Sequence, residues 1–169
     1  MAKRRDGLEK GLVGVAGEYL VAAELTRRGY LASLTLRNSR GVDVFVSDPE
    51  ASRAVGVQVK TNSGSRRKWL LTEKVERYVA RNLFYVFVNL HDGARPATYH
   101  VVPSTDVAGY AKRRHRRWLR GTKRDGSPRK DTAMRSFRDW DGDYLDAWNL
   151  LRLDRGRKRR RSRINRRRE

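Results

Sequence analysis

The sequence predicts an α/β domain in which a mixed central β-sheet is flanked by helices. Three observations support this prediction: an amphipathic helical pattern near the N-terminus, two alternating segments joined by a short turn, and an almost wholly apolar run in mid-chain. Helices and strands that follow one another in mixed order pack as layers around one core. A chain of 169 residues, 38% of them hydrophobic, has room for one such domain.

The first element is a predicted amphipathic helix over about residues 11–29. Its apolar residues recur near helical spacing, and Gly29 provides a natural stop. These residues are Leu12, Val15, Ala16, Tyr19, Leu20, Ala23 and Leu25. Small residues at positions 14, 16 and 17 let this helix approach another backbone closely. That approach is what would bring Glu18 toward the sheet.

The following elements are predicted strands. Alternation begins after Tyr30, and residues 42–46 and 54–60 form two strands at hairpin distance, which predicts an antiparallel pair. Residues 84–90 are nearly all apolar, as in a central strand buried on both faces. Residues 98–102 form a further strand. A helix capped near Ser104 or Thr105 is expected to run through Trp118, and a short helix over 144–151 closes the domain.

Charge divides the chain into two parts. The sequence holds 40 Lys+Arg against 19 Asp+Glu, a net charge of +21, which favours a polyanionic partner and above all nucleic acid. Residues 154–169 carry +8 and leave +13 on residues 1–153. We therefore expect a domain over 1–153, with a flexible basic loop at about 121–139, and a disordered arginine-rich tail over 154–169. A merely solubilising tail is the alternative interpretation.

Several classes of function are disfavoured. The chain has no cysteine, so disulfide frameworks, thiolate chemistry and cysteine-based zinc sites are excluded. The basic N-terminus does not resemble a signal peptide, and no segment is long and apolar enough to span a membrane. These features fit a cytoplasmic, nucleoid-associated protein. The three histidines, at positions 91, 100 and 115, lie far apart in the sequence, so core or surface roles are expected for them.

Polar residues interrupt the valine pattern of the two hairpin strands. Side chains alternate along a strand, so Gln58 and Lys60 share the face opposite the neighbouring valines. Asp43 lies opposite the valines of the preceding strand. If both valine faces join one core, then Asp43, Gln58 and Lys60 lie on one side of the hairpin.

With Glu18, this pattern resembles the PD-(D/E)XK nuclease superfamily, in its Holliday-junction-resolvase-like branch. The similarity covers about residues 10–62 and rests on Gly17-Glu18, on Arg28-Gly29-Tyr30, on residues 37–43 ending in Gly41-Val42-Asp43, and on Val57-Gln58-Val59-Lys60. It implies a restriction-endonuclease-like fold and a metal-dependent DNA endonuclease, with branched or structured DNA as a candidate substrate. DNA is favoured over RNA as partner, and a homodimer is an open alternative because resolvase-like members commonly dimerise.

The resemblance also implies roles for the four residues. Glu18, Asp43 and Gln58 would ligate Mg²⁺ or Mn²⁺, and Lys60 would stabilise charge or orient the attacking water. Two departures stand out: Val42 replaces a proline common in the family, and Gln58 replaces an acidic ligand.

Less specific interpretations remain open. Glu18 would then be an ordinary helix carboxylate, Asp43 would cap a turn, and Lys60 would blunt a strand end. For the whole chain, the alternatives are a non-catalytic nucleic-acid-binding protein with a degenerate nuclease fold and an RNA- or ribosome-associated protein that relies on its tail.

Clustered cations predict the nucleic-acid contacts. They lie before Asp43, in a small and basic loop over 63–69, in the all-round cationic helix segment 112–118, and in the tail. The predicted contact residues are Arg40, Arg66, Arg67, Lys68, Lys112, Arg113, Arg114, Arg116, Arg117, Lys158, Arg159, Arg160 and Arg161. Trp118 is a candidate for stacking on unpaired bases, whereas Trp140 and Trp148 are expected in the core.

Overall fold

The computed structural model describes residues 9–36, 41–93 and 95–156. The helices are α1 (Lys10–Arg27) and α2 (Ser104–Leu119), with short 3-10 turns η1 (Glu73–Glu76), η2 (His91–Gly93), η3 (Trp148–Leu151) and η4 (Leu153–Gly156). The strands are β1 (Leu31–Leu34), β2 (Val44–Ser47), β3 (Ala54–Asn62), β4 (Lys68–Thr72), β5 (Leu83–Asn89), β6 (Thr98–Pro103) and β7 (Met134–Arg138). The predicted α/β class is confirmed.

Five strands form the central sheet in the order β1-β2-β3-β5-β6. The predicted hairpin is confirmed, since β2 and β3 pair antiparallel from Val44↔Val57 to Ser47↔Ala54. By contrast, β3 and β5 run parallel, because β4 and η1 separate them in the chain and carry it back across the domain. The sheet is therefore mixed, with one parallel pair among antiparallel ones.

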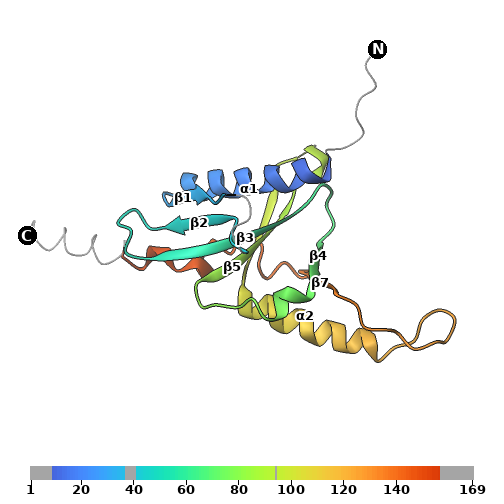
Figure 1. Cartoon of the computed structure of the whole chain (residues 1–169). Helices are drawn as coiled ribbons and strands as arrows, with labels where there is room; N and C mark the ends of the chain where they lie inside the picture. The colour runs from blue at the N-terminus through green and yellow to red at the C-terminus, as the bar shows by residue number, and fades with distance from the viewer. Residues whose placement is uncertain (1–8, 37–40, 94, 157–169) are drawn as a thin grey trace, which may run out of the picture.

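The two faces of the sheet bury different cores. The alternating valines of β2 and β3 pack with Val21 and Leu25 of α1 and with Trp148 of η3. The opposite face of β5, carrying Tyr85 and Phe87, packs with β4, β7 and α2. Figure 1 shows α1 and α2 on opposite sides of the sheet.

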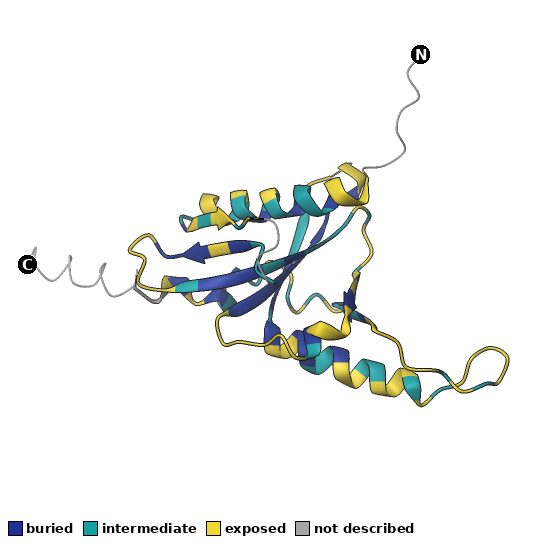
Figure 2. Ribbon diagram, in the orientation of Figure 1, coloured by how far each residue is buried: buried dark blue, intermediate teal, exposed yellow. Residues whose placement is uncertain are grey.

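The central strand β5 is buried along its whole length. All seven of its residues are buried, because both faces are covered and strands pair on both edges. In Figure 2 it lies among the dark blue elements in the middle of the molecule. This confirms the prediction of a central strand from the apolar run.

Three sequence predictions are wrong in part. The basic segment 121–139 is not a loop throughout, because Met134–Arg138 forms β7 and pairs antiparallel with β4 in a second, two-stranded sheet. Within the loop predicted over 63–69, Lys68 begins β4 and Trp69 is buried, with its indole Nε1 donating to the Val88 carbonyl at 3.0 Å. Trp140, predicted in the core, is 60% exposed, whereas Trp148 is buried as expected.

At the end of the predicted domain, Leu153 is buried in the core and begins η4, which runs to Gly156. The remainder of the predicted tail, including Lys158, Arg159, Arg160 and Arg161, lies outside the described residues. Arg40 lies outside them as well.

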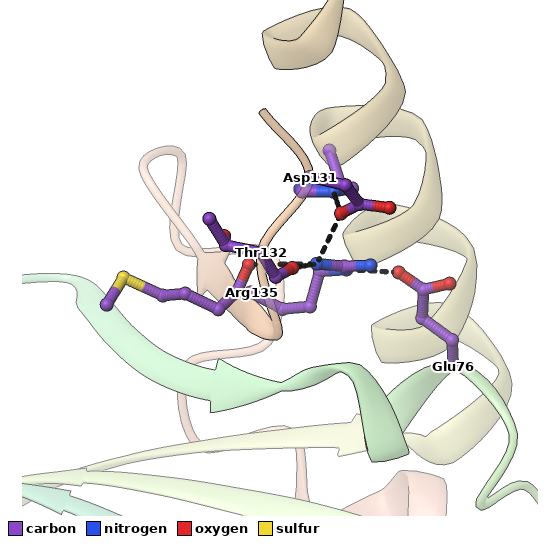
Figure 3. Close-up of polar contacts among 6 residues, drawn as sticks. Glu76, Asp131, Thr132 and Arg135 are labelled. Atoms are coloured by element: carbon purple, nitrogen blue, oxygen red, sulfur yellow. Dashed lines mark hydrogen bonds and ion pairs between the residues drawn. The ribbon is translucent and has the colours of Figure 1, made fainter. Parts of the chain in front are cut away.

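Arg135 joins the second sheet to its surroundings (Figure 3). Its guanidinium donates to the Glu76 carboxylate of η1 and to the Thr132 carbonyl, and Asp131 lies 3.9 Å away. The Arg135 side chain is only 7% exposed, so Glu76 supplies the charge compensation that a buried guanidinium needs. This contact explains how an arginine occupies an inward position of β7.

In the part of the chain that the structure describes, neither helix has the length and apolar character needed to cross a membrane.

Candidate active site

The two polar residues of β3 lie on the face away from α1. Gln58 is in parallel register with Tyr85, and Lys60 with Phe87, on the side of the sheet covered by β4, β7 and α2. Both side chains are half-buried. Their same-face placement, predicted from strand alternation, follows from the burial of Val57 and Val59 on the other side.

Asp43 lies beside this pair. Its carboxylate Oδ2 accepts a hydrogen bond of 2.7 Å from the Val59 N–H, and its own N–H donates to the Val57 carbonyl at 2.8 Å. Both bonds flank Gln58, so the structure brings Asp43 and Gln58 together as predicted. A hydrogen bond to a carboxylate oxygen fixes its position and leaves the other oxygen for a further partner.

A glycine anchors the segment that precedes Asp43. Gly41 has a φ of +68°, in the left-handed region that disfavours other residues, and a Cβ added there would lie 2.4 Å from Cε1 of Tyr78. The Tyr78 ring thus covers Gly41. Any larger residue at position 41 would displace the chain two residues before the site.

Glu18 lies on α1, which packs against the opposite face of the sheet. The preceding residue, Gly17, is buried against β3: a Cβ there would lie 1.9 Å from Oγ1 of Thr61, which directly follows Lys60. The predicted close approach of this helix is therefore confirmed at Gly17. Glu18 itself is half-buried next to that contact, while Glu24 on the same helix forms ion pairs of 2.8 Å with Arg27 and Arg28.

Tyr85 is a neighbour of the site that the sequence did not single out. It is buried in register with Gln58, and burial, followed by the influence of Tyr78 and Asp43, raises the pKa of Tyr85 to about 12. The phenol thus remains protonated near neutral pH. The alternation of β5 was the available signal, because it places Tyr85 on the face of Gln58.

The donor set fits a hard divalent cation with few protein ligands. Among the described residues, no three His, Cys, Asp or Glu side chains come together as a metal cluster. Asp43 and Gln58 nevertheless offer a carboxylate and an amide oxygen, and Glu18 follows the residue of α1 that contacts β3. Mg²⁺ is typically held by one or two carboxylates together with water and substrate phosphate.

The two nucleic-acid contacts predicted within residues 63–67, Arg66 and Arg67, have different surroundings. Arg66 is exposed, whereas Nη1 of Arg67 donates to the Trp140 carbonyl at 2.8 Å. The Nδ2 of Asn62 donates to the carbonyls of Arg66 and Lys68 at 3.0 and 2.9 Å, which fixes the backbone of the segment. Part of the Arg67 guanidinium is therefore used in a hydrogen bond within the protein, whereas Arg66 faces solvent.

The predicted contacts on α2 divide by face. Arg113, Arg114 and Arg117 line a groove between α2 and the β4–β7 sheet, whereas Lys112 and Arg116 are exposed outside it. The sequence missed further cations of this groove, because they lie in the segment predicted as a loop. These additional residues are Arg129, Arg135 and Arg138.

The fold has counterparts among solved structures. The bacterial homing endonuclease I-Ssp6803I is 16% identical, with a TM-score of 0.52 over 91% of this chain and 98% of that chain. The chain has a restriction-endonuclease-like fold. The predicted fold is thereby confirmed. Hjc, a Holliday junction resolvase from Archaeoglobus fulgidus, is 13% identical, with a TM-score of 0.46 over 75% of this chain and 84% of that chain.

No family model and no curated protein matches the sequence. The restriction-endonuclease-like fold is therefore visible in the backbone at sequence identities too low to assign a function.

Proposed function

We propose that the protein is a metal-dependent endonuclease that hydrolyses phosphodiester bonds in DNA, with branched or structured DNA as its substrate. The observation that supports the proposal best is the position of the Asp43 carboxylate. It accepts a hydrogen bond from the Val59 N–H and lies beside Gln58, and both Val59 and Gln58 belong to β3, the strand that carries Lys60. The oxygens of Asp43 and Gln58 can bind a metal ion, and the Lys60 ammonium can stabilise negative charge; the cleavage of a phosphodiester uses both.

Asp43 and Gln58 would hold the Mg²⁺ or Mn²⁺, and Glu18 would complete the set from α1. The bound ion would polarise the scissile phosphate and lower the pKa of a water molecule. Lys60 would place its ammonium against the charge that develops on the phosphate oxygens. Tyr85, as a neutral phenol in register with Gln58, would contribute polarity to the site without adding charge.

The charge of the domain supports DNA as the substrate. Residues 1–153 alone carry +13, and the exposed cations Lys68 and Arg117 belong to β4 and α2, which pack on the face of the sheet that carries Lys60. Such a charge would attract a phosphate backbone at long range and would keep the protein on cellular DNA in the cytoplasm or nucleoid. A homodimer would present two such surfaces to a branched substrate.

Gln58 favours a second candidate function. An amide is a neutral and weaker ligand than a carboxylate, and the described residues hold no cluster of three acidic or histidine ligands. The alternative is a nucleic-acid-binding protein with this fold and without cleavage activity.

The deciding experiment incubates the full chain with supercoiled, four-way-branched and single-stranded DNA, in Mg²⁺, Mn²⁺ or EDTA. Asp43→Asn and Lys60→Met are compared with Asp154→Asn and Lys10→Met, which make the same chemical changes at exposed positions away from the site. We expect cleavage in metal only, its loss in the first two variants, and its retention in the controls. Equal cleavage by all four variants would refute the assignment of the site, and binding without cleavage of any DNA would support the alternative.

A further inference from the structure

A basic groove lies between α2, the β4–β7 sheet and the segment that connects α2 to β7. We call it the α2 groove; its volume is about 660 Å³. Seven of its fifteen lining residues are Lys or Arg and none of the fifteen is acidic, while one of the seven, Arg135, is paired with Glu76 outside the lining. A concave surface with charge of one sign concentrates ligands of the opposite sign.

Two of these cations are neighbours across the β4–β7 strand pair, and the pairing places no negative charge between them. Lys68 of β4 is directly opposite Arg138 of β7 in the antiparallel register. Like charges in this arrangement destabilise a sheet. The pair is therefore better explained by an anionic ligand than by the stability of the protein alone.

Other cations are held in place by aromatic and hydrogen-bonding contacts. The guanidinium carbon of Arg129 lies 5.1 Å from the centre of the Trp118 ring, and its Nη1 donates to the Trp118 carbonyl at 2.9 Å. The His115 ring stacks on Trp118 with centres 5.5 Å apart. Trp118 thus orients Arg129 at the groove, and its stacking on unpaired bases stays a prediction.

Apolar side chains lie among the cations. Leu70 and Met134 line the α2 groove and are 62% and 63% exposed. A contact to the sugar-phosphate backbone of a duplex makes little use of such side chains, because the bases are turned inward. An unpaired strand presents both phosphates and base faces, the combination that single-strand-binding surfaces accommodate with cations and apolar or aromatic groups.

The size of the groove supports the same ligand. Pockets that enclose small molecules span roughly 300–1,000 Å³, so a groove of about 660 Å³ has room for a short run of nucleotides. The β4–β7 layer also covers the face of the sheet that carries Lys60, with Trp69 and Phe87 in contact at 5.0 Å between ring centres. Lys68 and Leu70, which line the groove, alternate along β4 with the buried Trp69 and Leu71, so the groove opens on the face of this layer that is turned away from the central sheet.

We propose that the α2 groove binds an unpaired DNA strand through its phosphates and base faces. Its substrates would then be DNA molecules with a single-stranded segment next to the cleaved duplex. That the strand is DNA rests on the proposed function, whereas the binding of a single strand rests on the groove itself.

The test measures fluorescence anisotropy of a labelled single-stranded DNA and of the matched duplex, with the full chain in EDTA so that no cleavage occurs. The charge variant Arg113→Gln/Arg117→Gln is compared with Lys112→Gln/Arg116→Gln, which removes the same charge from the same helix outside the groove. The apolar variant is Leu70→Ser/Met134→Ser. Thermal unfolding checks that each variant is folded.

We expect the groove charge variant to lose about tenfold in single-strand affinity, and its salt-dependence slope to fall by about 1.4 for two lost phosphate contacts. The control on Lys112 and Arg116 should lose no more than about twofold, because these exposed side chains lie outside the groove and make no direct contact with a strand bound in it. The apolar variant should weaken single-strand binding about fivefold and leave duplex binding unchanged.

Three results would overturn the proposal: equal losses in the two charge variants, equal effects of the apolar variant on single strand and duplex, or tighter binding of an RNA strand of the same sequence. The groove proposal and the endonuclease proposal can also be disproved independently of each other. Asp43-dependent cleavage with unaltered single-strand binding by the groove variants would remove only the groove assignment. The expected groove results without cleavage of any DNA would remove only the endonuclease.

Discussion

The carboxylate of Asp43 accepts a hydrogen bond of 2.7 Å from the backbone N–H of Val59. The β2–β3 ladder ends at the pair Val44↔Val57, while β3 continues to Asn62. Beyond that pair the edge of β3 has no backbone partner from β2, and the Asp43 side chain takes its place. Asp43 is thus a structural cap of the ladder as well as a candidate metal ligand, and substitutions can separate the two roles.

We expect Asp43→Asn to preserve the fold and abolish cleavage. The asparagine carbonyl can still accept from Val59, so the free energy of unfolding should fall by less than about 1 kcal/mol, whereas cleavage should fall at least about 100-fold with the lost charge. Asp43→Ala should cost about 1–3 kcal/mol, because the Val59 N–H loses its acceptor. Urea unfolding and plasmid nicking measure the two effects, and equal stability losses in the two variants would contradict the capping role.

Gln58→Glu is expected to increase the affinity for metal. A third carboxylate beside Asp43 raises the negative charge of the site, so the Mn²⁺ affinity should rise about tenfold. Without metal, repulsion from Asp43 should lower the melting temperature, and added metal should raise it more than in the wild type.

Calorimetric titration with Mn²⁺ and melting curves with and without metal measure these changes. Gln58→Ala is the control that removes the amide without adding charge. If Gln58→Glu bound Mn²⁺ no better than the wild type, position 58 would not be a ligand.

Gly17→Ala should destabilise the protein and disturb the position of Glu18. The added Cβ would lie 1.9 Å from Oγ1 of Thr61, so α1 must move away from β3, at a cost of about 1–3 kcal/mol. Gly14→Ala on the same helix meets nothing within 4 Å and should stabilise by up to about 1 kcal/mol.

A second substitution tests the cause. Thr61→Ala removes Oγ1 and Cγ2, two of the three Thr61 atoms that the added Cβ would meet, so Gly17→Ala/Thr61→Ala should be more stable than the sum of the two single changes predicts. Chemical denaturation of the four variants measures this coupling. Strict additivity would show that the close approach of Gly17 to Thr61 is not the source of the destabilisation.

The sequence could predict the parts of the site that depend on local alternation. The valines of β2 and β3 fixed which face carries Gln58 and Lys60, and the small residues of α1 indicated the approach at Gly17. The position of the Glu18 carboxylate could not be predicted, because it depends on how α1 packs across the sheet and not on the helical pattern itself.

The sequence could not reveal the second sheet for a physical reason. Each of its strands has five residues, and the two lie more than sixty residues apart in the chain, so no hairpin signal joins them. The inward position of Arg135 also breaks the apolar alternation of β7. The tertiary contact with Glu76, which no local pattern reveals, compensates the charge of the arginine there.

Lys68→Gln should change stability and DNA affinity in opposite directions. Removing one charge of the Lys68↔Arg138 pair relieves a like-charge contact, so the protein should gain about 0.2–1 kcal/mol. The same change removes a phosphate contact and should weaken DNA binding. Thermal unfolding measures the change in stability and fluorescence anisotropy the change in DNA affinity. Lys74→Gln is the control, at an exposed position outside the groove. A loss of stability in Lys68→Gln would contradict the repulsion.

The hydrogen bonds of His91 should make the 63–67 segment sensitive to acid. Nδ1 of His91 lies 2.7 Å from the Ser65 hydroxyl and Nε2 lies 3.0 Å from the Thr98 hydroxyl, and Arg95 also donates to Ser65. Burial, aided by Arg95 and opposed by Asp92, lowers the pKa of His91 from its ordinary value of 6.5.

Because the folded protein favours the neutral imidazole of His91, the unfolded chain binds the proton more readily. The stability that His91 contributes is then complete above about pH 6.5 and is lost as the pH falls through the lower pKa of the folded state. Urea unfolding at about pH 7.5 and about pH 5.5 should show a smaller acid loss in His91→Asn than in the wild type. His115→Asn is the control, and hydrogen exchange of residues 63–67 locates the effect. An unchanged acid loss in His91→Asn would show that His91 binds its proton equally in both states.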